Sequence, residues 1–381
     1  MAALPRFRNG RGAVRETLAG LAGAMLLAGA PACVAADPGP LSEIKVSVAT
    51  GPALPLGRAA ERWAQHLTES ANSRYVAKLY PGASLAGRDA ARELATLKDG
   101  KADLAVGSAL QWSLQVPALG VFSLPWIAPE PRALEALASS EPLRSALASR
   151  LEAQGVALVA LAPLGYREVA TMSRAIRGPA DLKGLRLRAS ASPMLHEMLL
   201  ALGALPQAMP FAEAQGEFAK GTLDGQEGPP TALAAARAAA SGQRYLTGWG
   251  AIGDAMVFVV RKALWDVFTE PERENVRRAA RLAITDAGAV AQEDAAVRRL
   301  GQNGVGVIRI TAAGHDAFRA AVRDVSARWR GAVGSEIVKL ADDTLAETAI
   351  SARGETAGPP VPMGTGATDV PGVPVEPARS R

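Results

Sequence analysis

The sequence has few of the side chains that catalysis, metal binding and cross-linking require. It contains one cysteine, Cys33, and three histidines, none of which has a second histidine at metal-ligand spacing. A single cysteine excludes an internal disulfide and a cysteine-based metal site. No G-x-S-x-G elbow, Walker loop, H-E-x-x-H or EF-hand pattern occurs. We therefore expect no cofactor, no metal ion and a protein that is not an enzyme.

A strong charge of either sign is also missing. The formal net charge is +5, and the first 36 residues carry four arginines and one glutamate, which leaves +2 for the remainder. This charge is too small to indicate nucleic acid, and no run of lysine and arginine with interleaved aromatics occurs. A chain of 381 residues with 49% hydrophobic content is long enough for two domains with large cores.

No apolar run has the length that comfortably spans a bilayer. The apolar stretch at residues 18–32 follows an arginine-bearing segment and precedes Val34-Ala35-Ala36. This order predicts a secretory signal peptide over residues 1–36. Lipoprotein cleavage before Cys33 is the alternative, and Pro31 fits that site badly. Both routes export the chain, and we expect a periplasmic protein.

Strand and helix patterns alternate after the leader. Alternating or continuous apolar residues predict strands at 44–49, 75–80 and 103–107, and a period near 3.6 predicts helices at 56–70 and 88–98. This order is typical of an open α/β sheet with parallel strands. The loops after Ala49 and Gly107 would then face a common cleft.

Further elements follow the same logic. We expect helices at 131–154, 269–300 and 312–349, and strands at 156–161, 256–260 and 304–310. Thr269 and Glu272 form a capping box, and the helix that they start is long enough to bridge two domains. Residues 351–381 are rich in proline and glycine without apolar periodicity, which predicts a disordered tail.

The stretch around Arg188 carries the strongest functional signal. Leu185 and Leu187 alternate with Arg186 and Arg188, which predicts a strand with one cationic face. Ser192 followed by proline then predicts the start of a helix. Arg188 would lie where a strand ends and a helix begins, which is where α/β sheets bind ligands. A guanidinium there can bind a carboxylate bidentately, although a solvated strand face would give the same pattern.

Three motifs in this region indicate a family. Gly165-Tyr166-Arg167, the strand D-L-K-G-L-R-L-R that ends at Arg188, and D-G-Q-E-G-P that ends at Pro229 occur in this order. In these motifs the chain resembles the substrate-binding proteins of tripartite ATP-independent periplasmic (TRAP) transporters, the DctP-like family. The resemblance covers about residues 44–340.

The resemblance implies an α/β, two-domain periplasmic binding protein fold of type II-like architecture. This fold has two sheets with flanking helices, a ligand cleft between the domains and a long bridging helix. Domain I would comprise residues 41–165 and 253–290, and domain II would comprise residues 166–252 and 291–348.

The resemblance also implies a ligand site. Arg188 matches the arginine that forms a salt bridge with a substrate carboxylate through both guanidinium nitrogens, and Arg167 matches a second contact. Phe211, in Pro210-Phe211-Ala212-Glu213, matches an aromatic residue that packs on the ligand. In the family the loops after the first and third strands line the ligand site, which points here to Ala53, Leu54, Ser108 and Trp112. Trp249 is a further candidate for the apolar enclosure of the ligand. Trp112 fits a core position equally well.

One family position differs. The family's Q-E-N-P asparagine is replaced by Gly228, which removes a donor and an acceptor and opens space. A bulkier or less polar acid than sialic acid or a C4-dicarboxylate would fit such a site. Gln226 and Glu227 match the family motif and can equally be structural.

The expected function follows from the resemblance. The protein would bind a small organic acid, close its two domains around it and deliver it to the small and large TRAP membrane subunits. We expect a monomer without a nucleic-acid partner. Two alternatives stay open on the sequence: a periplasmic carboxylate sensor that signals to a sensor kinase, and an exported α/β enzyme.

Overall fold

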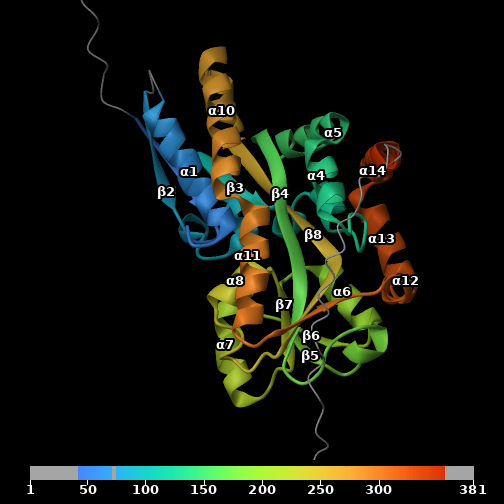
Figure 1. Cartoon of the computed structure of the whole chain (residues 1–381). Helices are drawn as coiled ribbons and strands as arrows, with labels where there is room; N and C mark the ends of the chain where they lie inside the picture. Colours follow the sequence, from blue (N-terminus) through green and yellow to red (C-terminus); the bar gives the residue numbers. More distant parts are fainter. Residues whose placement is uncertain (1–41, 71–73, 357–381) are drawn as a thin grey trace, which may run out of the picture. The chain divides into compact units, whose positions relative to one another are not determined.

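The structure is a computed structural model, and it describes residues 42–70 and 74–356 (Figure 1). The predicted signal peptide (1–36) and residues 357–381 of the predicted tail lie outside the described residues. The described elements belong to one compact unit, so the boundaries of the two predicted domains stay a prediction. None of the helices that the structure describes is long and apolar enough to cross a membrane.

The amino-terminal half has the predicted α/β order. Strands β1 (Ser42–Val48), β2 (Tyr75–Tyr80) and β3 (Leu104–Ser108) are parallel, with β1 in the centre. Helix α1 (Pro55–Glu69) places Trp63 against Phe258, with ring centroids 5.2 Å apart. The predicted helix at 88–98 is shorter, because only α2 (Glu93–Lys98) is α-helical and residues 90–92 form a 3₁₀ turn. We call β1–β3 and their helices the first lobe.

Two long antiparallel strands, β4 (Val156–Thr171) and β8 (Tyr245–Arg261), run through the centre of Figure 1. β3 pairs with β8, and β7 pairs with the end of β4. The two sheets that we expected are therefore joined into one nine-stranded sheet with the order β2-β1-β3-β8-β4-β7-β5-β6, and β9 pairs with β8. The strand predicted at 156–161 continues to Thr171, because register shifts carry it past Pro163 and Gly165.

The second lobe surrounds the three short strands at the bottom of Figure 1: β5 (Arg186–Ala189), β6 (Leu205–Ala208) and β7 (Gly225–Gly228). β5 is parallel to both of its neighbours. The predicted cap is confirmed, since the Ser192 hydroxyl accepts a hydrogen bond from the Leu195 amide at the start of α6 (Pro193–Ala201). Helices α7 (Phe211–Lys220) and α8 (Pro230–Ala235) complete this lobe.

The predicted bridging helix is divided. α10 (Glu270–Ala287) packs on α1, and α11 (Ala289–Gln302) packs on α8 and β4, so the pair extends from one lobe to the other. The capping box of Thr269 and Glu272 is present. The break falls at Gly288, whose φ of +53° lies in the left-handed region that ends helices.

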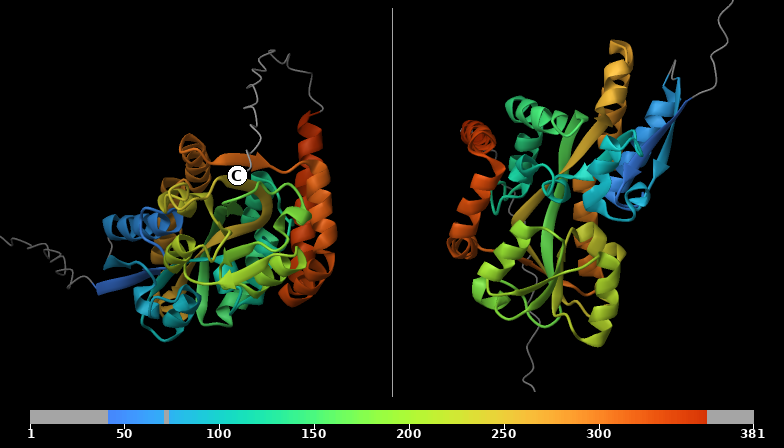
Figure 2. Two further views of the ribbon diagram at one scale, coloured as in Figure 1. Left: turned by 90° about the horizontal axis from the view of Figure 1, so that it is seen from below. Right: turned by 180° about the vertical axis from the view of Figure 1, so that it is seen from behind.

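The carboxy-terminal helical segment is divided as well. α12 (Ala312–Ala321), α13 (Arg323–Val333) and α14 (Ser335–Thr356) replace the single helix predicted at 312–349. Gly334, with a φ of +105°, separates the last two. Residues 351–356, which we assigned to a disordered tail, continue α14. Figure 2 shows these helices in red on the side of the sheet away from α1.

The predicted helix at 131–154 also breaks, at Ser140, into α4 and α5. The remaining elements are short or peripheral; their bounds are η1 Ser84–Ala86, η2 Ala90–Arg92, α3 Ala109–Trp112, η3 Pro117–Ser123, α4 Pro131–Ser139, α5 Glu141–Glu152, η4 Pro179–Leu182, α9 Lys262–Val267 and β9 Gly306–Arg309.

Candidate functional site

A cavity of about 470 Å³ lies between loops of the first lobe and strand ends of the second. The first lobe contributes the loop after β1, the turn before α2 and helix α3, and the second lobe contributes the segments after β5 and β6. The segments after Ala49 and Gly107, which the sequence placed at a common cleft, both reach this cavity, the second as helix α3. The lining residues are Ala49, Thr50, Arg88, Asp89, Ala90, Ala91, Leu110, Gln111, Leu114, Arg188, Ser190, Ala191, Ser192, Ala208, Met209, Pro210 and Phe211.

Arg188 lies in the wall of this cavity, on β5. Its side chain is 7% exposed, and it donates through Nε to the Met209 carbonyl (3.0 Å) and through Nη1 to the Glu227 carbonyl (3.2 Å). In the described part of the chain no group accepts a hydrogen bond from Arg188 Nη2. Burial lowers the pKa of Arg188 from its usual value, which marks a poorly solvated cation. Arg188 Nη2 is therefore available to donate a hydrogen bond to a ligand.

Arg167 and Glu227 form a buried bidentate ion pair. Arg167 Nε and Nη2 lie 2.6 Å and 3.0 Å from the two Glu227 carboxylate oxygens, and Nη2 also donates to the Ser190 hydroxyl. Glu227 is fully buried and also accepts from the Ser190 amide. Burial acts to raise the pKa of Glu227, but the charge and hydrogen bonds of Arg167 lower it below its ordinary value. Glu227 is therefore ionised at neutral pH.

The three side chains carry an unbalanced charge. Arg188 Nη1 lies 3.8 Å from the same Glu227 carboxylate. Two guanidinium groups thus share one carboxylate in a poorly solvated place, which leaves a formal charge of +1. One added carboxylate would neutralise this cluster, which we call the Arg167–Glu227–Arg188 cluster. Arg167 does not line the cavity, because its fork is directed at Glu227.

Phe211, predicted to pack on the ligand, lies beside Arg188. It lines the cavity, and the Arg188 guanidinium carbon lies 5.3 Å from its ring centroid, within cation–π range. Gly228 ends β7, is buried and does not line the cavity. A Cβ atom at Gly228 would meet only Leu233, at 3.9 Å, so a Cβ fits there without a clash.

Three predicted site residues lie outside the cavity lining. Ser108 donates to the buried Asp254 carboxylate at 2.5 Å and caps α3 by accepting from the Gln111 amide. Trp112 and Trp249 are both fully buried in the main core. The Trp249 indole donates to the Arg167 carbonyl at 2.8 Å, so it supports the ion pair from behind.

The first-lobe loop contacts also differ from the prediction. Ala53 and Leu54 do not line the cavity, and Ala49 and Thr50, just before them, do. Arg88 and Asp89 were not predicted as site residues, because the sequence pattern assigned them to a helix at 88–98, whereas they lie in the turn before α2. Pro81-Gly82 and Gly87 were available signals of a tightly turned loop there.

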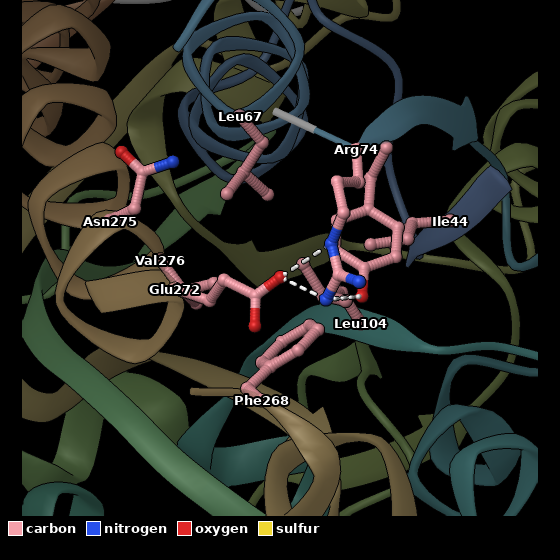
Figure 3. A pocket seen from close by; sticks show the side chains of 9 residues that line it. Ile44, Leu67, Arg74, Leu104, Phe268, Glu272, Asn275 and Val276 are labelled. Atoms are coloured by element: carbon pink, nitrogen blue, oxygen red, sulfur yellow. Dashed lines mark hydrogen bonds and ion pairs between the residues drawn. The ribbon is translucent and has the colours of Figure 1, made fainter. Parts of the chain in front are cut away.

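A second cavity lies under α10 in the first lobe (Figure 3). Its volume of about 30 Å³ is enough for a single water molecule. Figure 3 shows Arg74 directed at Glu272, and the closest atoms of this ion pair are 2.5 Å apart. The cavity is too small for an organic solute. Within residues 42–70 and 74–356 no group of three metal-ligating side chains is found.

Comparisons with known proteins place the chain in a family. Residues 46–331 match the model of the family "Bacterial extracellular solute-binding protein, family 7" (DctP). The C4-dicarboxylate-binding periplasmic protein DctP of Rhodobacter capsulatus is 26% identical over 317 residues, which are 82% of this chain and 91% of that protein.

Solved structures are also similar. A TRAP periplasmic solute-binding protein from Ralstonia eutropha H16, with bound (S)-2-acetolactate, is 40% identical with a TM-score of 0.75, over 80% of this chain and 99% of that one. One from Shewanella oneidensis, with bound succinate, is 20% identical with a TM-score of 0.71, over 80% and 99%, and shows the shared fold. The two-domain, type II-like architecture expected from the sequence is confirmed by these likenesses.

Proposed function

Because this chain belongs to family 7 of the bacterial extracellular solute-binding proteins, we propose that it captures an organic acid outside the cytoplasm and delivers it to TRAP membrane subunits. The observation that carries the proposal is the Arg167–Glu227–Arg188 cluster beside the cavity. The cluster is one negative charge short, and Arg188 Nη2 has no partner among the described residues.

The proposed role of each cluster residue follows from its contacts. Arg188 binds the ligand carboxylate, because it lines the cavity. Glu227 holds the two guanidinium groups in place, and Arg167 contributes positive charge from behind rather than direct contact. The Ralstonia relative, 40% identical, holds a short branched oxo acid, so acids of that size are the first ligands to test.

Charge alone does not give useful affinity. A hydrogen bond to a charged group is worth about 1.5–3 kcal/mol, whereas micromolar binding needs about 8 kcal/mol. The rest must come from apolar enclosure. Leu110, Leu114 and Met209 line the cavity beside Phe211, and they take the part that the sequence suggested for Trp112 and Trp249.

Domain closure is the proposed mechanism of capture. The cavity walls come from both lobes, so a bound acid contacts both. The strands β4 and β8 connect the two lobes. The register shift of β4 at Gly165 lies in the part of the strand that passes from one lobe to the other. Closure about this place would enclose the acid, and the closed form would be the one that the membrane subunits bind.

A thermal-shift screen tests the proposal. The purified protein is heated with a panel of mono- and dicarboxylates that includes 2-acetolactate, and each hit is titrated by calorimetry. We expect at least one short acid to raise the melting temperature, and we expect Arg188→Ala to remove that rise. Binding of an acid that survives unchanged in Arg188→Ala would contradict the assignment of the site.

A further inference from the structure

A second arginine, Arg88, lines the same cavity from the first lobe. Its side chain is exposed, and within the described residues it has no hydrogen bond or ion pair. The pair Arg88 and Arg188 therefore presents two cations to one cavity, each from a different lobe. Only Arg188 has a role in the proposed function.

The backbone at Arg88 is held in an unusual conformation. Its φ is +66°, in the left-handed region that residues other than glycine, asparagine and aspartate seldom adopt. Gly82, Ala83 and Gly87 in the same turn also have positive φ. An arginine here carries conformational strain that a glycine would avoid, and such strain is concentrated at ligand sites.

The charges around Arg88 leave it open to a ligand. Its neighbour Asp89 is the one acidic residue among the lining residues, and one of its carboxylate oxygens accepts from the Ala91 amide at 3.0 Å. One ligand carboxylate neutralises the Arg167–Glu227–Arg188 cluster. A simple alkyl acid has only that carboxylate, so the charge of Arg88 would stay unpaired after such an acid binds.

We propose that Arg88 is a specificity-determining residue that binds a second oxygen of the ligand, a ketone or a second carboxylate at the end remote from Arg188. This inference rests on the proposed function and narrows its ligand class. Acids with such an oxygen are favoured over alkyl acids of the same shape, because only they pair both cations. The ligand then connects the two lobes at both of its ends.

Matched ligands and matched variants test the inference. The probes are 4-oxopentanoate against 4-methylpentanoate, and succinate against butyrate, titrated by calorimetry into wild type, Arg88→Ala and Arg88→Lys. In wild type we expect at least one member with the second oxygen to bind about tenfold more tightly than its partner, as one charge-assisted hydrogen bond predicts. Arg88→Ala should reduce this ratio to about twofold or less and leave the alkyl acid unaffected, and Arg88→Lys should keep part of the ratio.

Two further variants separate the outcomes. Arg92→Ala removes an exposed arginine of the neighbouring turn that does not line the cavity, and it should leave every ratio unchanged. Arg188→Ala should abolish binding of both members of a pair, which tests the proposed function alone. An unchanged ratio in Arg88→Ala would overturn the inference. The inference would also be overturned if Arg88→Ala lost the same affinity for both acids of a pair and if this loss disappeared at high salt. That result would show only a long-range electrostatic attraction. Failure of every acid to bind wild type would overturn the proposed function as well.

Discussion

Replacement of Glu227 by glutamine should show how much the charge of Glu227 contributes to the stability of the folded protein. The variant keeps the size of the side chain but removes the charge that two buried guanidinium groups share. Breaking a buried ion pair by removing one partner costs about 3–5 kcal/mol. At about 2–4 °C for each kcal/mol in a chain of this order of size, the melting temperature should fall by about 10 °C.

The assay is differential scanning calorimetry of wild type and Glu227→Gln at neutral pH. Glu213→Gln is the matched control, because it removes an exposed carboxylate from α7 in the same lobe. We expect the control to melt within about 1 °C of wild type, as surface substitutions usually do. If Glu227→Gln also melted within about 2 °C of wild type, the two arginines would not depend on this carboxylate, and the reasoning about the cluster would be refuted.

Three further predictions concern single residues. Arg188→Ala should abolish the ligand-induced rise in melting temperature, and a retained rise would contradict this. The melting temperature of the ligand-free protein should change little. The variant loses two hydrogen bonds to carbonyls, but it also no longer buries a cation, and that burial is unfavourable enough to lower the pKa of Arg188. Gly228→Asn should leave the preference among acids unchanged in calorimetric titration, because Gly228 does not line the cavity and a new Cβ there meets only Leu233 at 3.9 Å; a shift toward smaller, more polar acids would show that the asparagine side chain reaches the ligand. Glu93→Gln should remove a loss of stability that begins above the unfolded pKa of this carboxyl and is complete near pH 8. Burial raises the pKa of Glu93 to about 8 although Ser47 donates to it, so the folded state binds the proton more tightly than the unfolded state. The contribution of Glu93 to stability is therefore greatest below the unfolded pKa, decreases as pH rises toward about 8, and changes no further above that pH. Melting curves of both proteins at pH 6–9 check this, and parallel curves would contradict it.

The local features of the binding region could be predicted from the sequence. Alternation of leucine and arginine places Arg188 on a strand, and Ser192-Pro193 starts the following helix, because both signals depend on residues only a few positions apart. Phe211 follows from a family motif of the same local kind, and the structure brings it to the Arg188 side chain.

Features that depend on distant residues could not be predicted. Arg167 and Glu227 are 60 positions apart, and no local sequence pattern shows that the Arg167 guanidinium is paired with the Glu227 carboxylate. The depth of Trp112 depends on packing against Gly107, where an added Cβ would lie 2.0 Å from the indole. The division of the bridging helix at Gly288 is a choice between a tolerated glycine and a helix end, which tertiary packing decides.

A crystal structure of the protein with a bound acid tests the central claim most directly. The account predicts that a ligand carboxylate oxygen lies within hydrogen-bond distance of Arg188 Nη2, with the Arg167–Glu227 ion pair intact behind it. A complex in which the acid lies elsewhere, and in which Arg188 bonds only to the Met209 and Glu227 carbonyls, would contradict it.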